Sequence, residues 1–260
     1  MKKLESVGMV CEYLPEISYE EAKRIIHRYY GLVIRSRFNV DRQFIDCAGN
    51  LRFIARAGSG LENIDVLHAK DRGIACFNSP EGNRDAVGEH ALGLLLAVVN
   101  KICSADREVR DGKWNRKSNW GTELKGKTIG IIGYGNTGSA LAEKLSGLGT
   151  KVISYDKYKT GYSDAFTEET GMDRIFEETE ILSFHVPLTD ETVNLVDCNY
   201  IDRFKKPFII INTSRGGIIK TEDLTDALQD GRITGAGLDV LEYEGADFEA
   251  LNFYELQQSF

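Results

Sequence analysis

Short apolar runs alternate with amphipathic stretches along most of this chain. In the second half, the runs predict buried β-strands near residues 128–133, 151–156, 181–186, 207–213 and 233–240. The stretches between the runs repeat apolar residues at helical spacing, as Ala140, Leu141, Leu145 and Leu148 do after the first run. Strands that alternate with helices in this way predict a parallel sheet with helices packed on its faces.

The first half alternates in the same manner. Strands are predicted at Val7–Leu14, Leu32–Arg35, Phe53–Ala57 and Ile74–Phe77. Helices are predicted around residues 20–30 and from residue 41 onward. The pattern therefore predicts a separate parallel-sheet domain at the start of the chain.

One long helix is predicted from Arg84 to Arg110, because the chain is almost wholly apolar from Ala91 to Val99 and polar from Ser104 onward. This pattern is typical of a helix that is buried between two domains and then emerges, so we place the domain boundary within it. We expect the α/β fold class, with two doubly wound parallel-sheet domains formed by residues 1–97 and residues 98–260.

Three glycines follow the strand predicted near 128–133 and form the pattern G-x-G-x-x-G: Gly133, Gly135 and Gly138. In a dinucleotide-binding unit, the first glycine permits a tight turn and the second lets backbone approach a pyrophosphate. The third allows the helix to pack closely on the strand, and the helix N-terminus faces the phosphates. The alternative is a purely structural β-turn-α unit, which leaves the position of the next acid to chance.

That acid is Asp156, which ends the following predicted strand about 20 residues after the glycines. A carboxylate in this place can accept hydrogen bonds from both ribose hydroxyls of an adenosine, whereas a 2′-phosphate would meet like charge. The sequence therefore favours NAD over NADP as the cofactor. Lys157 and Lys159 lie close to Asp156 and weaken this discrimination.

Composition narrows the possible functions. The 260 residues are 42% hydrophobic, enough to bury sizeable cores in one large or two smaller domains. No segment has transmembrane length, and Glu5 and Glu12 interrupt any apolar core of a signal peptide, so we expect a cytoplasmic protein with no membrane partner. A net charge of −8 argues against a nucleic-acid-binding protein, because such proteins carry an excess of basic residues. Five cysteines without C-x-x-C spacing predict buried free thiols and no metal site.

Polar residues follow three of the later apolar runs, where ligands bind in open α/β sheets. These residues are His185 to Thr189, Asn212 to Gly217, and Asp239 with Glu242 and Glu244. Together with the glycine turn they would line one crevice.

Five motifs, in order along nearly the whole chain, resemble the D-isomer-specific 2-hydroxyacid dehydrogenases: RAGSGLENID (56–65), GIIGYGNTG (130–138), HVPLT (185–189), INTSRGGII (211–219) and GAGLDVLEYE (235–244). Within that family, residues 33–37, 111–114 and 121–127 most resemble D-3-phosphoglycerate dehydrogenases without the C-terminal regulatory domain. The resemblance implies a Rossmann-type NAD-binding domain and a flavodoxin-like substrate domain. It also implies an NAD-dependent oxidoreductase that acts on a small 2-hydroxy or 2-keto acid, and a homodimer with an interface in residues 98–127.

The resemblance also implies roles for individual residues. Arg215 would hold the carboxylate and carbonyl oxygen of the substrate, since its planar fork suits a carboxylate. Glu244 would pair with a catalytic histidine and raise the pKa of that histidine, with Glu242 as the alternative acid. Asp239 would accept a hydrogen bond from the nicotinamide carboxamide.

The remaining implied cofactor-binding residues are Gly133, Gly135, Asn136, Thr137, Gly138, Asp156, His185, Val186, Pro187, Thr213 and Ser214. The implied carboxylate-binding turn consists of the backbone amides of Ala57, Gly58, Ser59 and Gly60.

The catalytic histidine of the family lies in a T-P-H segment that follows one more strand, and this chain stops at Phe260 before such a segment. Among the four histidines, His185 belongs to the cofactor-side turn, and His90 is interpreted as a packed residue of the buried helix. We therefore expect a longer protein that is truncated here at both ends, with its catalytic histidine beyond residue 260.

Arg35 and Arg37 flank Ser36 where phosphoglycerate-type members bind the substrate phosphate, and alternation along a strand end would point both arginines to the same side. The expected reaction is therefore oxidation of 3-phosphoglycerate by NAD, in serine biosynthesis. One alternative is a dehydrogenase for an unphosphorylated acid such as glycerate or lactate. Another is a non-catalytic NAD(H) sensor resembling the C-terminal-binding-protein corepressors.

Overall fold

The computed structural model describes residues 2–243 and divides the chain into two compact units that meet between Ser79 and Pro80. We had placed the boundary later, after residue 97. The reason for the difference is helix α5 (Arg84–Val99), which packs on helix α7 (Asn136–Leu145) of the second unit. A Cβ atom at Gly88 of α5 would lie only 3.0 Å from the backbone of Ala140, so the two helices touch closely.

The first unit is a small parallel sheet with strand order β1-β2-β3, formed by Gly31–Ile34, Phe53–Arg56 and Ala75–Phe77. Its helices are α1 (Lys2–Glu5), α2 (Tyr19–Ile25), α3 (Arg42–Asp46), α4 (Val66–Asp71) and the 3-10 turn η1 (Ile26–Arg28). Phe44, Ile45 and Ile54 are almost fully buried and hold these helices against the sheet. The predicted parallel α/β character of this unit is confirmed, in a sheet of three strands.

The strand predicted at residues 7–14 is not formed. Val7, Val10 and Tyr13 have exposed fractions of 72%, 100% and 72%, so the apolar run does not contribute to the core. Gly8 adopts a positive φ of 90°, which ends any extended run at its start. The apolar character of this segment alone therefore gave the wrong prediction.

The second unit contains a six-stranded parallel sheet with the order β6-β5-β4-β7-β8-β9. These strands are Glu168–Glu169, Lys151–Tyr155, Thr128–Ile132, Ile181–Phe184, Phe208–Asn212 and Ile233–Leu238. Numbered along the chain from β4, the order is 3-2-1-4-5-6, which is the Rossmann arrangement. The order reverses between β4 and β7, so the glycine turn after β4 lies at the switch point where such sheets bind ligands.

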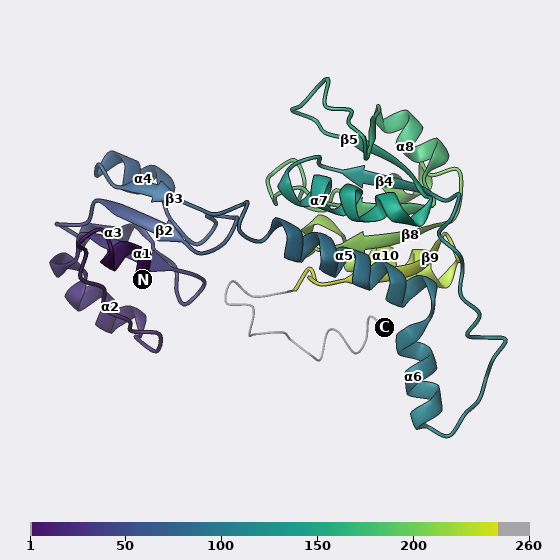
Figure 1. The fold of residues 1–260 in the computed structure, drawn as a ribbon, viewed down its shortest axis with the longest axis horizontal. Helices are drawn as coiled ribbons and strands as arrows, with labels where there is room; N and C mark the ends of the chain where they lie inside the picture. The colour runs from purple at the N-terminus through teal and green to yellow at the C-terminus, as the bar shows by residue number, and fades with distance from the viewer. Residues whose placement is uncertain (1, 244–260) are drawn as a thin grey trace. The chain divides into compact units, whose positions relative to one another are not determined.

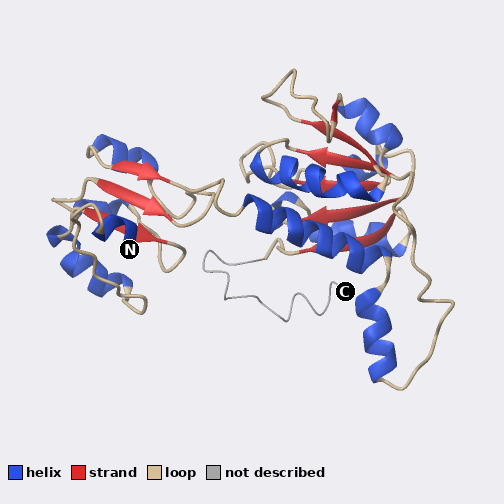
Figure 2. Cartoon of the chain, in the orientation of Figure 1, coloured by secondary structure: helices blue, strands red, loops and turns tan. Residues whose placement is uncertain are grey.

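Helices cover both faces of this sheet, as expected for a doubly wound fold (Figure 1, Figure 2). Helices α5 and α7 share one core with Ile129, Ile131 and Ile211. Alternate residues of the same strands, such as Leu182 and Ile210, face a second core with the other helices. Those helices are α8 (Met172–Glu178), α9 (Cys198–Asp202) and α10 (Thr221–Gln229), with a 3-10 turn at Gly216–Ile218. A second 3-10 turn, Ser146–Leu148, follows α7 and packs on the first core.

The long helix predicted from Arg84 to Arg110 is two helices. Lys101 adopts a left-handed conformation with φ 53°, which separates α5 from α6 (Ile102–Arg110) and turns the axis by 58°. Taken singly, none of the helices in residues 2–243 is long and apolar enough to cross a membrane. Only α5 and α6 together pass that test of length and composition.

The cysteines also differ from expectation. Cys47, Cys103 and Cys198 are exposed, while Cys11 and Cys76 are half-buried, and all five are free thiols. In the part of the chain that the structure describes, no group of three or more histidine, cysteine or acidic side chains forms a metal site.

Candidate functional site

The glycine turn after β4 is held against two neighbouring segments. Gly133 has a φ of +92°, and a Cβ atom there would lie 2.6 Å from the carbonyl oxygen of His185 and 2.8 Å from a side-chain carbon of Val186. A Cβ atom at Gly138, in the first turn of α7, would lie 2.1 Å from the carbonyl oxygen of Gly133. Only glycine fits at either position, which agrees with the tight-turn and close-packing tasks predicted for them.

Gly135 has the opposite environment. No atom lies within 4 Å of the place where its Cβ would be, so the backbone of this residue borders open space. Gly135 is also the N-cap of α7, and no side chain caps that helix. Uncapped amides at a helix N-terminus attract anions, so the turn and the helix fit the pyrophosphate of a dinucleotide.

Asp156 follows β5 and reaches back to the glycine turn. Its Oδ2 atom accepts a hydrogen bond from the amide of Tyr134 at 2.9 Å, and its Oδ1 atom accepts one from the amide of Tyr158 at 3.0 Å. A carboxylate has about four lone-pair sites, so each oxygen keeps capacity for a ribose hydroxyl. These bonds fix the acid in place beside the turn.

Tyr134 anchors the turn from the protein side. Its ring is 5% exposed and stacks on Tyr162 with 5.2 Å between ring centroids. Its hydroxyl donates to Asp164 Oδ2 at 2.8 Å, and burial together with this bond raises the pKa of Tyr134. Tyr134, which stands between the first two glycines of the motif, therefore anchors the loop that follows Asp156.

The two lysines near Asp156 both have partners. Lys159 Nζ donates to the carbonyl oxygen of Tyr134 at 2.8 Å. Lys157 Nζ lies 2.7 Å from Oε2 of Glu191, and the hydroxyl of Tyr158 donates to that same oxygen at 2.7 Å. Glu191 thereby connects the segment after β5 to the segment after β7.

His185, after β7, is joined to the glycine turn through its side chain. Its Nδ1 atom lies 3.1 Å from the hydroxyl of Thr137, and its Nε2 atom lies 2.9 Å from the hydroxyl of Ser183. Burial lowers the pKa of His185 to about 4, so the imidazole is neutral near pH 7. Thr137 and His185 were both predicted at the cofactor site, and the structure brings them into contact. Val186 is half-buried beside them, and Pro187 is exposed.

The segment after β8 is shaped by Asn212, which is fully buried. Its Oδ1 atom accepts hydrogen bonds from the amide and the hydroxyl of Ser214, and its Nδ2 atom donates to the carbonyl oxygen of Arg215 at 2.9 Å. The guanidinium of half-buried Arg215 donates to the carbonyl oxygen of Ser214 at 2.7 Å. The hydroxyl of Thr213 is buried with no hydrogen-bond partner in the described structure, a cost that a ligand could offset.

The segment after β9 brings Asp239 next to α5. Asp239 Oδ1 lies 2.9 Å from Nε2 of His90, and the side chains are 47% and 53% exposed. His90 is therefore an accessible partner of a predicted cofactor residue and not the packed histidine we expected. Glu242, the alternative acid, accepts a hydrogen bond from the amide of Thr221 at 2.7 Å and caps α10. Glu244 lies outside the described residues.

The predicted substrate residues belong to the first unit, at the carboxyl ends of β1 and β2. In the turn after β2, the amides of Ala57 and Gly58 donate to carbonyl oxygens of the fold, those of Ile34 and Arg56. Among residues 2–243, the amides of Ser59 and Gly60 find no acceptor, so the predicted carboxylate cradle is reduced to these two groups. Arg56 braces this turn by donating to the carbonyl oxygen of Gly60 at 2.6 Å.

Arg35 and Arg37 differ in their surroundings. The guanidinium of Arg37 donates to the carbonyl oxygen of Glu16 at 2.9 Å and lies 3.4 Å from the Glu16 carboxylate. Arg35 and Ser36 are exposed, and the Arg35 guanidinium has no hydrogen-bond or ion-pair partner within the described chain. Of the two arginines, Arg35 is therefore the available cation.

Sequence reasoning missed three residues that shape the nucleotide side of the site: Tyr134, Glu191 and His90. Tyr134 stands between the first two glycines, and Glu191 lies two residues after HVPLT, so both are near motifs that we had recognised. His90 is separated from Asp239 by 149 positions, and the packing of α5 against β9 brings them together.

Comparisons of sequence and structure find proteins that this chain resembles. Residues 92–258 match the family model described as "D-isomer specific 2-hydroxyacid dehydrogenase, NAD binding domain". The chain is 40% identical to a hydroxypyruvate reductase of Thermotoga maritima, over 92% of this chain and 77% of that protein. It is 38% identical to a D-3-phosphoglycerate dehydrogenase of Archaeoglobus fulgidus, over 91% of this chain but only 45% of that longer protein.

The fold superimposes with a TM-score of 0.83 on an acyclic imino acid reductase in complex with NADPH and D-arginine. That structure is 28% identical, and the match covers 93% of this chain and 78% of that one.

We predict that Gly138→Ala weakens NADH binding at least about tenfold, because the added Cβ would overlap the carbonyl oxygen of Gly133 and displace the turn. Gly147→Ala is the matched control, since a Cβ there meets no atom within 4 Å. Titration of NADH fluorescence measures both affinities. Unchanged binding by Gly138→Ala would contradict the assignment of the turn.

Proposed function

This chain belongs to the D-isomer specific 2-hydroxyacid dehydrogenase family, and from that membership we propose that the full-length protein interconverts a D-2-hydroxy acid and a 2-keto acid with NAD(H). One observation carries the proposal. The segment that holds Arg215 follows β8 of the same sheet whose β4 leads into the glycine turn, so the guanidinium that we expect to bind substrate belongs to the same sheet edge as that turn. Ligands of open parallel sheets bind along this edge.

In the proposed mechanism Arg215 binds the substrate and polarises its carbonyl. A guanidinium presents parallel N–H donors, which match a carboxylate and an adjacent keto oxygen better than an ammonium would. The bonds that Asn212 makes to both sides of this residue hold the segment in one conformation. When bound, NADH supplies the hydride that reduces the carbonyl carbon. The carbonyl oxygen also requires a proton, which a general acid donates in this proposal.

Asp239 and His90 complete the nicotinamide end in this proposal. Asp239 would accept a hydrogen bond from the carboxamide, and its contact with Nε2 of His90 through Oδ1 leaves the other carboxylate oxygen for that bond. A fixed carboxamide determines which face of the nicotinamide ring meets the substrate, so Asp239 and His90 would set the orientation of the nicotinamide.

The proposed substrate is 3-phosphohydroxypyruvate, which becomes 3-phosphoglycerate on reduction. Available Arg35 supports a phosphorylated substrate, as does the similarity to a D-3-phosphoglycerate dehydrogenase. The similarity to a hydroxypyruvate reductase supports the unphosphorylated alternative. The ion pair between Arg37 and Glu16 supports it as well, because a paired guanidinium attracts a substrate phosphate less strongly.

The proposal predicts that the full-length protein oxidises NADH, followed at 340 nm, and prefers 3-phosphohydroxypyruvate to hydroxypyruvate, glyoxylate and pyruvate. Arg215→Lys should lower kcat/KM at least about a hundredfold for whichever acid is reduced, because the planar fork is lost. Binding of NADH without reduction of any acid would replace this function with a non-catalytic NAD(H) sensor.

A second prediction separates the two arginines of the first unit. Arg35→Ala should raise KM for 3-phosphohydroxypyruvate about tenfold and leave KM for hydroxypyruvate within about twofold, because only the former carries a phosphate. Arg37→Ala is the matched control and should raise both KM values equally or not at all, since its guanidinium is bonded to residue 16. Equal effects of Arg35→Ala on the two acids would remove the phosphate assignment.

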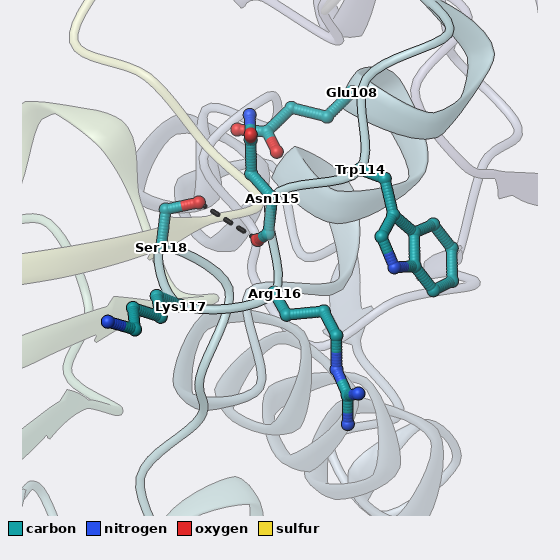
Figure 3. Close-up of a pocket in the computed structure, with 6 residues that line it drawn as sticks. All are labelled: Glu108, Trp114, Asn115, Arg116, Lys117 and Ser118. Carbon is teal, nitrogen blue, oxygen red and sulfur yellow. Dashed lines mark hydrogen bonds between the residues drawn. The ribbon is translucent and has the colours of Figure 1, made fainter.

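We also propose that the protein is a homodimer assembled through α6 and the following residues. Ile102 and Val109, two turns apart on α6, are each 53% exposed, and Trp114 and Trp120 are 77% and 67% exposed. Figure 3 shows Trp114 and Arg116 extending from the segment after α6, where Ser118 bonds to the carbonyl oxygen of Asn115. Large apolar side chains exposed along one segment favour an interaction surface there.

For this dimer, the double variant Ile102→Asp, Val109→Asp should sediment as a monomer in analytical ultracentrifugation at micromolar concentration, while the unmodified protein sediments as a dimer. Two buried charges per subunit would oppose association. Leu67→Asp alters a residue of similar exposure on α4, 78%, and should stay dimeric. A monomeric unmodified protein, or a dimeric double variant, would refute the interface.

A further inference from the structure

The cofactor pocket carries a feature that bears on which nucleotide it accepts. Asp156 is followed by two lysines, Lys157 and Lys159, either of which would attract the 2′-phosphate of NADP. Neither ammonium group is available in the structure. Lys159 is bonded to the carbonyl oxygen of Tyr134, and Lys157 is paired with Glu191.

Glu191 binds two consecutive residues of that loop through a single oxygen. Lys157 Nζ and the hydroxyl of Tyr158 each lie 2.7 Å from its Oε2 atom. The hydrogen bond from Lys157 lowers the pKa of Glu191, and the bond to Glu191 raises the pKa of Lys157, so both groups are charged at neutral pH. The preceding residue, Asp190, is exposed and contacts no charged group of the described structure.

We propose that Glu191 is a positioning residue for cofactor selectivity, which holds Lys157 away from the ribose 2′ position so that the charge of Asp156 acts there alone. Asp156 would then accept the 2′-hydroxyl of NAD and repel the 2′-phosphate of NADP. The inference rests on the nucleotide site of the proposed function. It adds that the selectivity depends on a residue of a different loop, after β7, that does not itself contact the nucleotide.

Related folds have been solved in complex with NADPH and in complex with NAD, so the fold alone does not choose between the nucleotides and local charges must decide. Here Lys157 lies next to Asp156 in the sequence, but its ammonium group is paired with the carboxylate of Glu191. Lys157 and Glu191 are each 53% exposed, so solvent screens their pairing and a lysine released from Glu191 can be expected to move at little cost.

The test uses ADP-ribose and 2′-phospho-ADP-ribose as probes, with each affinity for the full chain measured by isothermal titration calorimetry. These probes lack nicotinamide and need no catalysis, and they differ only in the 2′-phosphate. Glu191→Ala should tighten binding of 2′-phospho-ADP-ribose about two- to fivefold, the scale of an exposed ion pair, and change ADP-ribose binding by less than about twofold.

Two further variants identify the cause. Asp190→Ala removes the same charge from the same turn without touching Lys157, so it should leave the ratio of the two affinities unchanged. The double variant Lys157→Met, Glu191→Ala should return the ratio to that of the unmodified protein, because the released cation is gone.

The inference is overturned if Glu191→Ala leaves the affinity ratio unchanged, or if the gain persists without Lys157. An equal gain with Asp190→Ala would also overturn it, since general repulsion by acidic residues would then be responsible. If ADP-ribose itself fails to bind the unmodified protein, the nucleotide site fails, and this outcome is separate from a failure of Glu191.

Discussion

The site depends on the close approach of three backbone segments at the carboxyl end of β4. The turn at Gly133, the first turn of α7 and the carbonyl group of His185 are so near one another that a single Cβ at Gly133 or Gly138 would overlap a carbonyl oxygen. This approach directs the uncapped N-terminus of α7 at the space beside Gly135. The switch in strand order between β4 and β7 separates the helices on the two faces and leaves that space open.

Several polar side chains at the carboxyl edge of this sheet hold loops in place through hydrogen bonds within the protein. Asp156 holds the glycine turn, Asn212 holds the segment of Arg215, and Glu242 caps α10. Since each loop is held by a neighbour, the groups that remain available are few. In the described part of the second unit they include the open backbone at Gly135, the lone pairs of Asp156 and Asp239, and the hydroxyl of Thr213. The first unit, taken by itself, offers Arg35 and the amides of Ser59 and Gly60. Preorganised groups of this kind lower the cost of ordering on binding.

The sequence predicted the second unit well because its strands are buried on both faces and read as apolar runs such as Ile129–Ile132. It predicted the glycine turn and Asp156 because their spacing follows from the geometry of one β-α-β unit. It was wrong for residues 7–14, where an apolar run has no core to join, and for the break at Lys101, where the chain has no glycine or proline and only Asn100 marks the end of α5. The pairs His90–Asp239 and Lys157–Glu191 join residues of different elements, so periodicity and local spacing could not predict them.

Hydrogen exchange, followed by mass spectrometry with and without NADH, tests the central claim that the edge around the glycine turn binds the dinucleotide. The account predicts slower exchange in residues 134–138 and 186–190 when NADH is present, with no change in α6, because the bound pyrophosphate would accept hydrogen bonds from the uncapped amides of α7. Protection that leaves residues 134–138 unaffected while NADH is bound would show that the nucleotide binds elsewhere, and the account would be wrong.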